Sequence, residues 1–236
     1  MKDGYVAIMQ PYLFPYIGYF HLIESADIFV FYDDVHYILS GWINRNRLLN
    51  ADKAYQFTVP ISKASQNKLI NKTSPIIDGK WKKKIFKTLI QNYKKAPFFS
   101  DVYEVITSVF ENKFTNVADL AIESILSVYR YLTIPINYTK SSICSPNTKG
   151  IGKAERIIQI TKELGYLAYV NAPGGKELYK KDYFRSKGVS LAFVKSKSIE
   201  YKQHSNKFIP CLSIIDILMF NEKERVIEFF SAYSLE

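Results

Sequence analysis

This chain of 236 residues is poor in the side chains from which disulfide frameworks and metal sites are built. It has two cysteines, Cys144 and Cys211, which are far apart and lack metal-ligand spacing. Its three histidines, His21, His36 and His204, form no metal-binding motif. We therefore expect two free thiols in a reducing compartment and no bound metal.

Long apolar runs are missing as well. No stretch reaches the ~20 apolar residues of a membrane-spanning helix. The N-terminus also lacks a basic region followed by an apolar signal core. We expect a cytoplasmic protein without a membrane span.

Arginine is scarce although the formal net charge is +10. The basic residues are mostly lysines spread along the chain, so we expect no nucleic-acid partner. One dense run, Lys80–Lys95, has Trp81, Ile85, Leu89 and Tyr93 near helical spacing, which predicts an amphipathic helix with a basic solvent face. Such a face is typical of a solvated surface, and it could also guide anionic sugar nucleotides or attract a membrane.

Apolar runs that suit buried strands alternate with helical patterns, and 47% of the residues are hydrophobic. These features predict an α/β fold: one domain, residues 1–236, with a mainly parallel sheet and a helical insertion or annex at about 80–132. The expected central strands are Tyr5–Met9, Ile28–Tyr32 and Leu167–Asn171, with further strands at Tyr55–Pro60 and Ile134–Thr139. The expected helices are Lys80–Lys95, Phe98–Glu111, Asn116–Leu132 and Lys153–Leu164.

Chemically able side chains gather in the segment 7–48. Gln10 ends the first strand, and Gly18 comes just before the apolar pattern of a short helix whose N–H groups favour an anion. His21 on that helix could act as a proton carrier or be a hydrogen-bonded residue of the helix flank. Asp33 and Asp34 follow the second strand, where open α/β sheets place their ligands, although paired aspartates also cap turns.

The next polar cluster is Asn44-Arg45-Asn46-Arg47, which follows Trp42. Two arginines are costly to bury unpaired, and their planar forks suit phosphates or carboxylates. Asn44 and Asn46 could orient polar groups beside them. A solvated loop is the alternative interpretation.

Two downstream segments add polar candidates. Asn171 to Tyr179 follows a predicted strand, and its paired glycines Gly174 and Gly175 would let backbone N–H groups face a ligand while Lys176 supplies charge; a tight turn is the alternative. Farther on, Ser213 and Asp216 lie one helical turn apart after a proline, a spacing typical of helix capping.

The segment 7–48 resembles the opening of the WbqC-like protein family, whose pattern is roughly Q-P-x-Y-x-P-x-x-G-Y-F, then A-D, D-D-V-Q-Y and N-R-N. The matching residues are Gln10, Pro11, Pro15, Gly18, Tyr19, Phe20, Ala26, Asp27, Asp33, Asp34, Val35, Tyr37, Asn44, Arg45 and Asn46. Further matches are Asn171–Tyr179 and Phe208–Asp216, so the similarity spans the chain. His36 departs from the pattern, which usually has Gln there.

The resemblance implies a role in O-antigen and related lipopolysaccharide biosynthesis. It suggests a transferase that adds a small acyl group, glycyl in the proposal made for some members, to an amino-sugar nucleotide. On that interpretation the catalytic candidates are His21, Asp33 and Asp34. The substrate-binding candidates are Gln10, Tyr12, Gly18, Tyr19, Asn44, Arg45, Arg47, Asn171, Gly174, Gly175, Lys176 and Tyr179.

Two alternatives remain open. The strand, proline-rich loop, Gly18, helix and second strand are similar in layout to nucleotidylyltransferases and other adenylate-forming enzymes, but the His-x-Gly-His signature is absent. A non-catalytic carbohydrate- or protein-binding module is the other. The expected partners are a sugar nucleotide and an acyl or amino-acid donor. The cofactor is left open, with ATP and Mg²⁺ as the candidates if the acyl group is activated in the same site.

Overall fold

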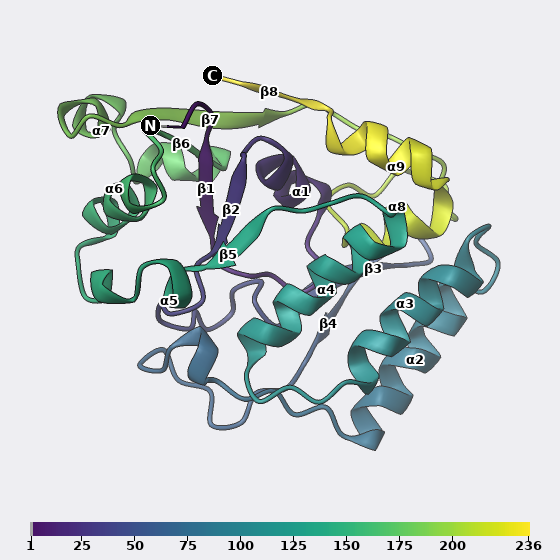
Figure 1. Ribbon diagram of the computed structural model, residues 1–236. Coiled ribbons are helices and arrows are strands. Elements are labelled where there is room, and N and C mark those ends of the chain that lie inside the picture. The colour runs from purple at the N-terminus through teal and green to yellow at the C-terminus, as the bar shows by residue number, and fades with distance from the viewer. Residues whose placement is uncertain (1) are drawn as a thin grey trace.

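A computed structural model describes residues 2–236. Six of its strands form one sheet in the order β5-β2-β1-β6-β7-β8 (Figure 1). The pairs β5–β2, β2–β1, β1–β6 and β6–β7 are parallel, and β7–β8 is antiparallel. The strands are β1 (Val6–Met9), β2 (Ile28–Phe31), β5 (Tyr138–Lys140), β6 (Ala168–Asn171), β7 (Ser190–Ser196) and β8 (Tyr233–Leu235). The fold is therefore α/β with a mostly parallel sheet.

The helices lie on both faces of this sheet or beside it. They are α1 (Ile17–Glu24), α2 (Gly79–Tyr93), α3 (Phe99–Glu111), α4 (Val117–Leu132), α5 (Ser141–Cys144), α6 (Lys153–Glu163), α7 (Lys181–Ser186), α8 (Ile214–Phe220) and α9 (Lys223–Phe230). Short 3-10 turns are η1 (Ile70–Lys72), η2 (Pro146–Thr148) and η3 (Pro173–Glu177). Among the described residues, no helix has the length and hydropathy needed to cross a bilayer.

Alternation along each strand gives the sheet two cores, because successive side chains point to opposite faces. On β1, Val6 and Ile8 pack with the helices α6 and α7, whereas Ala7 belongs to the larger cluster that includes α1, α4 and α9. That larger cluster also contains buried residues of α2 and α3. The helical segment expected at about 80–132 is thus packed through one continuous apolar core onto the rest of the chain.

Helix ends follow the local sequence. Asn116 caps α4 by accepting a hydrogen bond from the N–H of Asp119 at 2.9 Å, as its position before the apolar pattern predicts. Asp78 caps α2 through the N–H of Trp81 at 2.7 Å. After α6, Gly165 adopts φ +86°, a left-handed conformation that glycine reaches without a Cβ clash.

The strand expected at Tyr55–Pro60 lies outside the six-stranded sheet. It forms β4 (Lys53–Thr58), which pairs only with β3 (Arg45–Asn50) in an antiparallel hairpin among the described residues. The prediction of a strand is confirmed. The solvated loop considered as the alternative for the segment after Trp42 is not what forms there: residues 45–50 are β3, in which Asn46 and Leu48 point inward.

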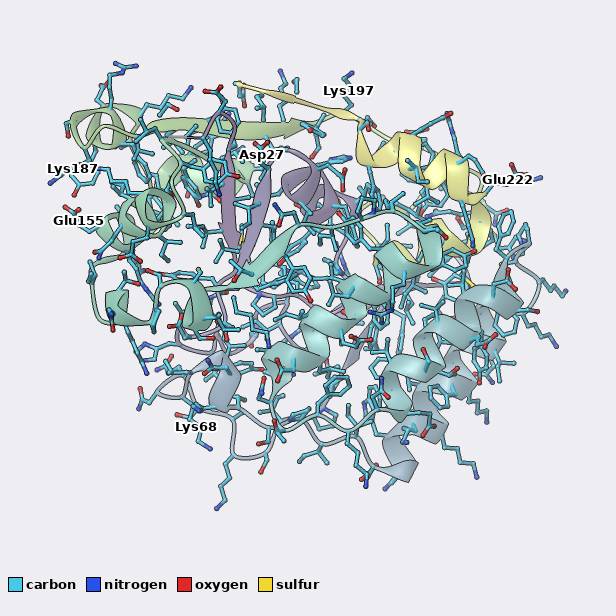
Figure 2. All side chains as sticks on the ribbon, viewed as in Figure 1. Asp27, Lys68, Glu155, Lys187, Lys197 and Glu222 are labelled. Atoms are coloured by element: carbon cyan, nitrogen blue, oxygen red, sulfur yellow. The ribbon has the colours of Figure 1, made fainter. Side chains whose placement is uncertain are left out.

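Figure 2 shows how densely side chains fill the space between these layers. At the outer edge of α6 and α7 it labels Glu155 and Lys187, whose charged groups are 3.3 Å apart. Both side chains are nearly half exposed, so this pair contributes little to stability.

Candidate functional site

The chain order reverses between β1 and β6. From β1 the sheet grows through β2 to β5 on one side, and from β6 through β7 on the other. Open α/β sheets bind ligands outside the carboxyl ends of strands at such a switch point. Gln10 follows β1 and Asn171 ends β6, so two sequence-predicted residues more than 150 positions apart lie on neighbouring strands.

Backbone contacts fix both loops at this edge. The Tyr19 hydroxyl donates to the carbonyl oxygen of Gln10 at 2.8 Å. On the other strand, Asn171 Oδ1 accepts from the N–H of Ala172 at 2.8 Å. A Cβ at Gly175 would lie 2.2 Å from Asn171 Nδ2, so any other residue there would have to displace the Asn171 side chain.

The rest of the glycine loop turns toward other partners. Lys176 forms an ion pair with Glu236 and lies 5.9 Å from the ring centre of Phe193. Tyr179 packs edge-on against Tyr169 at 6.4 Å. The space beside Gly174 is open, since a Cβ added there would meet no atom within 4 Å.

Asp33 is held by four hydrogen bonds at the end of β2. Its carboxylate accepts from Ser141 Oγ at 3.1 Å, from Ser142 N at 3.0 Å and Ser142 Oγ at 2.7 Å, and from Asn71 Nδ2 at 3.1 Å. Only 3% of Asp33 is exposed. The carboxylate therefore ties η1 and α5 to the sheet, a position that sequence reasoning could not assign because Ser141 and Ser142 lie more than 100 residues away.

Asp34 forms a buried ion pair with Arg156 of α6. Arg156 Nη2 lies 2.7 Å from Asp34 Oδ2, and the two side chains are 3% and 6% exposed. The arginine also donates to Thr148 Oγ1 at 3.0 Å and lies 4.9 Å from the ring centre of Tyr32. Sequence analysis missed Arg156, whose one signal is a charged side chain on the apolar side of a predicted helix.

His21 is fully buried on α1. Its Nε2 lies 2.9 Å from the carbonyl oxygen of Phe229, and its Nδ1 lies 2.8 Å from Ser196 Oγ. Because a carbonyl can only accept, Nε2 carries the proton and Nδ1 accepts from the serine. Burial lowers the pKa of His21, and the bond to Phe229 partly offsets this. The imidazole thus joins α1 to α9 and the end of β7.

The proline-rich loop after Gln10 has an unusual backbone. Phe14 is fully buried and adopts φ +40°, a region that side chains other than glycine rarely occupy. Three side chains from distant elements hold it: Ser124 Oγ accepts from its N–H at 2.8 Å, and Asn46 Nδ2 and Ser213 Oγ donate to its carbonyl oxygen at 2.7 and 2.6 Å. Asn46 and Ser213 of the sequence motifs are therefore clamps on this loop.

Asn44 has a similar supporting role. Its Oδ1 accepts from the Tyr37 hydroxyl at 2.7 Å, and its Nδ2 donates to the carbonyl oxygen of Val59 at 2.7 Å. The side chain is 4% exposed. Asn44 thus fixes the start of β3, and the two asparagines flank Arg45 on the strand.

Arg45 and Arg47 lie two residues apart on β3, so both side chains leave the same face of the strand. Each is half-buried, and within residues 2–236 neither forms an ion pair. The Nε atoms of both are buried without a hydrogen-bond partner in that range. Buried donors normally find partners, so the two unpaired Nε atoms need an explanation.

Aromatic and polar groups surround the arginines. The Arg47 guanidinium lies 5.4 Å from the ring centre of Trp42, and its Nη2 donates to the carbonyl oxygen of Cys211 at 2.9 Å. Burial and the neighbouring Cys211 thiol raise the pKa of Tyr16, and the Arg45 cation acts against the burial that raises the pKa of Tyr37. We call Tyr16, Trp42, Arg45, Arg47 and Cys211 the arginine cluster.

The arginine cluster reaches solvent through its aromatic residues. Trp42 and Tyr16 are each 39% exposed. Tyr12 is half-buried, with its ring centre 5.5 Å from that of Tyr19. The ring of Tyr16 fills the space beside Gly18 at the start of α1, where a Cβ would lie 2.4 Å from it. The sequence motifs missed Tyr16 and Cys211. Only the tertiary structure brings Cys211 to Arg47 and Tyr16 close to Cys211.

Other hollows lie elsewhere on the surface. One of about 280 Å³ is lined by Lys181, Arg185 and Gly188, and one of about 340 Å³ by Asp101, Glu104 and Tyr131. Neither includes a residue of the sequence motifs. Within residues 2–236, no three His, Cys, Asp or Glu side chains are grouped as a metal site requires.

Comparison with known proteins identifies the family to which this chain belongs. The profile of the WbqC-like protein family matches residues 10–228, so the chain belongs to that family. The chain is 29% identical over 217 residues to "Uncharacterized protein Rv1507c" of Mycobacterium tuberculosis, with 90% of this chain and 92% of the relative covered. No solved structure matches.

Proposed function

We propose that this protein is a transferase that uses the arginine cluster to hold the phosphate or carboxylate of its substrate. In its finer form, the proposal is transfer of a small acyl group, glycyl for preference, to the amine of an amino-sugar nucleotide. Membership of the WbqC-like family is compatible with an enzyme. The placement in surface-polysaccharide biosynthesis rests on the family resemblance.

One observation supports the proposal above all others. Arg45 and Arg47 present two guanidinium groups from one face of β3, with both Nε atoms buried and unpaired within the described chain. An arginine fork matches two oxygens of a phosphate or carboxylate. A diphosphate would supply an acceptor for each fork and neutralise both charges, a role that no carboxylate of residues 2–236 fills.

The neighbouring groups suit a sugar nucleotide. Trp42 is stacked by Arg47 on one side and remains 39% exposed, so its ring can pack against a planar base or the apolar face of a sugar. The clamped loop that carries Tyr12 and Tyr16 is rigid before the ligand binds, because four hydrogen bonds hold the backbone of Leu13 and Phe14. Such preorganisation lowers the entropic cost of binding.

The chemistry in the proposal is amide formation. The neutral amine nitrogen attacks the acyl carbonyl carbon, the bond from that carbon to the leaving group breaks, and the leaving group takes the electron pair while one amine proton passes to solvent or a base. Positioning of the two substrates supplies much of the acceleration in such a step. We assign the arginine cluster to that positioning, and Asp33, Asp34 and His21 to its structural support.

A binding module without turnover is the second candidate. It is favoured by the hydrogen bonding of the three predicted catalytic side chains, since His21, Asp33 and Asp34 are all buried and each is bonded to protein groups. A carboxylate or imidazole with its lone pairs occupied in this way is a poor proton acceptor. The two candidates share the ligand site and differ only in turnover.

The deciding experiment supplies purified protein with UDP-linked and dTDP-linked amino sugars together with glycine and ATP, or with glycyl thioester. A mass gain of roughly 57 Da per sugar nucleotide, that of the glycyl residue, is the expected product in a transferase that positions both substrates. Binding is measured in parallel by calorimetry. Binding without mass gain would favour the binding module.

Variants test the site itself. Arg45→Gln and Arg47→Gln should each lower affinity for the sugar nucleotide, whereas Arg130→Gln, which removes an exposed arginine paired with Glu123, is the matched control. Unchanged affinity in both cluster variants would remove the arginine cluster from the function.

A further inference from the structure

The helix α2 and the two residues after it are unusually one-sided in charge. The segment 79–95 contains seven lysines and no acidic residue: Lys80, Lys82, Lys83, Lys84, Lys87, Lys94 and Lys95. Within residues 2–236, Lys82 is the member of this set that forms an ion pair, with Glu111 of α3. The other six are exposed.

These lysines are placed where they oppose helix formation. Lys80 and Lys82 lie in the first turn, close to the positive end of the helix dipole, and Lys83 follows directly. Lys80 and Lys84, and Lys83 and Lys87, are four residues apart, a spacing that brings like charges together and destabilises a helix. The lysines therefore destabilise α2 in isolation. An anionic surface would neutralise their charges and remove this repulsion.

The exposed face of α2 that carries these lysines also contains an apolar side chain. Ile90 lies seven residues after Lys83 and three after Lys87, which puts it on the same helical face, and it is 41% exposed. The opposite face is fully buried at Leu89 and Tyr93 and packs into the core. The helix therefore has one face fixed in the protein and one face of lysines around a single exposed isoleucine.

The position of α2 makes this face accessible. Figure 1 shows α2 and α3 lying side by side at the margin of the molecule, on the side away from β7, and the two helices contact each other. The arginine cluster contains no residue of α2: its arginines are on β3, and its other members are in loops. The exposed face of α2 is thus available to a second partner. The inference about this face does not depend on the proposed function.

We propose that the lysine face of α2 (Lys80, Lys83, Lys84, Lys87, Ile90 and Lys94) docks this protein in the plane of a membrane surface that contains anionic phospholipids. Lysine is a compact, hydrated point charge on a flexible stem, and it attracts a diffuse layer of anionic headgroups without the fork geometry that reads individual phosphates. Ile90 enters the interfacial region between the lysines. The lysine face contains no arginine. This disfavours a nucleic acid as its partner, because arginine commonly recognises phosphates and bases.

The test is flotation of the full chain with vesicles of phosphatidylcholine alone and of phosphatidylcholine mixed with phosphatidylglycerol. The test variant carries Lys80→Gln, Lys83→Gln, Lys84→Gln and Lys87→Gln. The matched control carries Lys180→Gln, Lys181→Gln, Lys197→Gln and Lys202→Gln, four exposed lysines outside α2 that form no ion pair in the described chain. Both variants lower the net charge of +10 by four.

The wild type should float with the mixed vesicles and not with phosphatidylcholine alone. The α2 variant should partition on the order of a hundredfold more weakly, since each lysine near an anionic surface contributes favourably, and the control should keep most of the binding. Added salt should weaken binding, because the Debye length is ~10 Å at 0.1 M. Helical content and melting temperature verify that each variant is folded.

Three results would overturn the proposal. The wild type could fail to float with the mixed vesicles at low ionic strength. The two variants could lose binding equally, which would reduce the effect to net charge. The lysine face could bind an acidic protein or an RNA in preference to the vesicles, measured by competition, which would assign it to another class of partner.

Discussion

The side-chain amide of Asn46 donates a hydrogen bond to the carbonyl oxygen of Phe14 over 2.7 Å, and so β3 holds a loop 32 residues earlier in the chain in a left-handed conformation. The same nitrogen donates to the carbonyl oxygen of Leu13 at 2.9 Å. Asn46 Oδ1 in turn accepts from the N–H of Arg47. The buried amide of Asn46 thereby fixes the backbone of the loop that bears Tyr16 relative to the strand that bears the two arginines.

Replacement of Asn46 should therefore destabilise the fold. Asn46→Ala leaves the carbonyl oxygen of Leu13 without a donor and that of Phe14 with Ser213 Oγ alone. We expect a loss of about 1–3 kcal/mol in the free energy of unfolding, measured with urea. Asn50→Ala is the control on the same strand, since Asn50 is exposed, and should change stability by less than about 0.5 kcal/mol. Equal effects of the two variants would contradict the clamp.

Arg45→Lys separates a ligand-binding role from a structural one. Lysine keeps the charge and loses the fork, so affinity for the sugar nucleotide should fall by about 1.5–3 kcal/mol while the melting temperature is retained. Calorimetric titration and thermal unfolding are measured on the same sample. A lower melting temperature with unchanged affinity would make Arg45 a structural residue.

The buried ion pair between Asp34 and Arg156 is expected to be costly to break. Arg156→Met leaves the Asp34 carboxylate buried without its cation and should lower the free energy of unfolding by about 3–5 kcal/mol. Arg185→Met removes an exposed arginine whose partner Asp182 is 93% exposed, and should cost at most about 1 kcal/mol. Denaturant unfolding of both variants gives the comparison, and similar losses would show that the Asp34 pair is not specially stabilising.

His21 should make stability depend on pH in the acid range. Its pKa in the folded protein is lowered from 6.5 by burial, so the unfolded chain takes up a proton at a higher pH than the folded one. The contribution of His21 is present above pH 6.5 and is lost as the pH falls through the folded pKa. Unfolding free energies measured across this range should show a slope that His21→Gln removes.

His36→Gln is the control for that measurement, because His36 is exposed and Gln is usual at this place in the family pattern. It should leave the slope below pH 6.5 in place. A slope that persists in His21→Gln would show that His21 is not its source.

Local patterns in the sequence were enough to predict much of the fold. The alternation of short apolar runs with 3.6-residue periodicity predicted β1, β2, β6 and the helices α2, α3, α4 and α6 to within a few residues, and the α/β class follows from them. The capping role of Ser213 is also confirmed, since its Oγ accepts from the N–H of Ile215. These features depend on residues that are close together in the chain, so the sequence alone is enough to predict them.

Long-range partners were beyond the sequence. Asp216 has helix-cap spacing from Ser213, yet its carboxylate accepts from Tyr93 at 2.9 Å and Tyr201 at 2.6 Å. Burial raises the pKa of Asp216, and those hydrogen bonds oppose the shift. The strand β7 was not predicted either, and β8 pairs with it from the far end of the chain.

The sequence by itself determined where its polar motifs lie relative to the strands: the motifs around Gln10, Asn44 to Arg47 and Asn171 lie at the ends of strands of the sheet or on the β3–β4 hairpin. Only the tertiary structure decided what each does. A motif gives the type of a side chain, whereas its role depends on whether a partner from elsewhere in the chain fills its hydrogen bonds. Asp33, Asn46 and His21 have such partners, and the Nε atoms of Arg45 and Arg47 have none within the described chain.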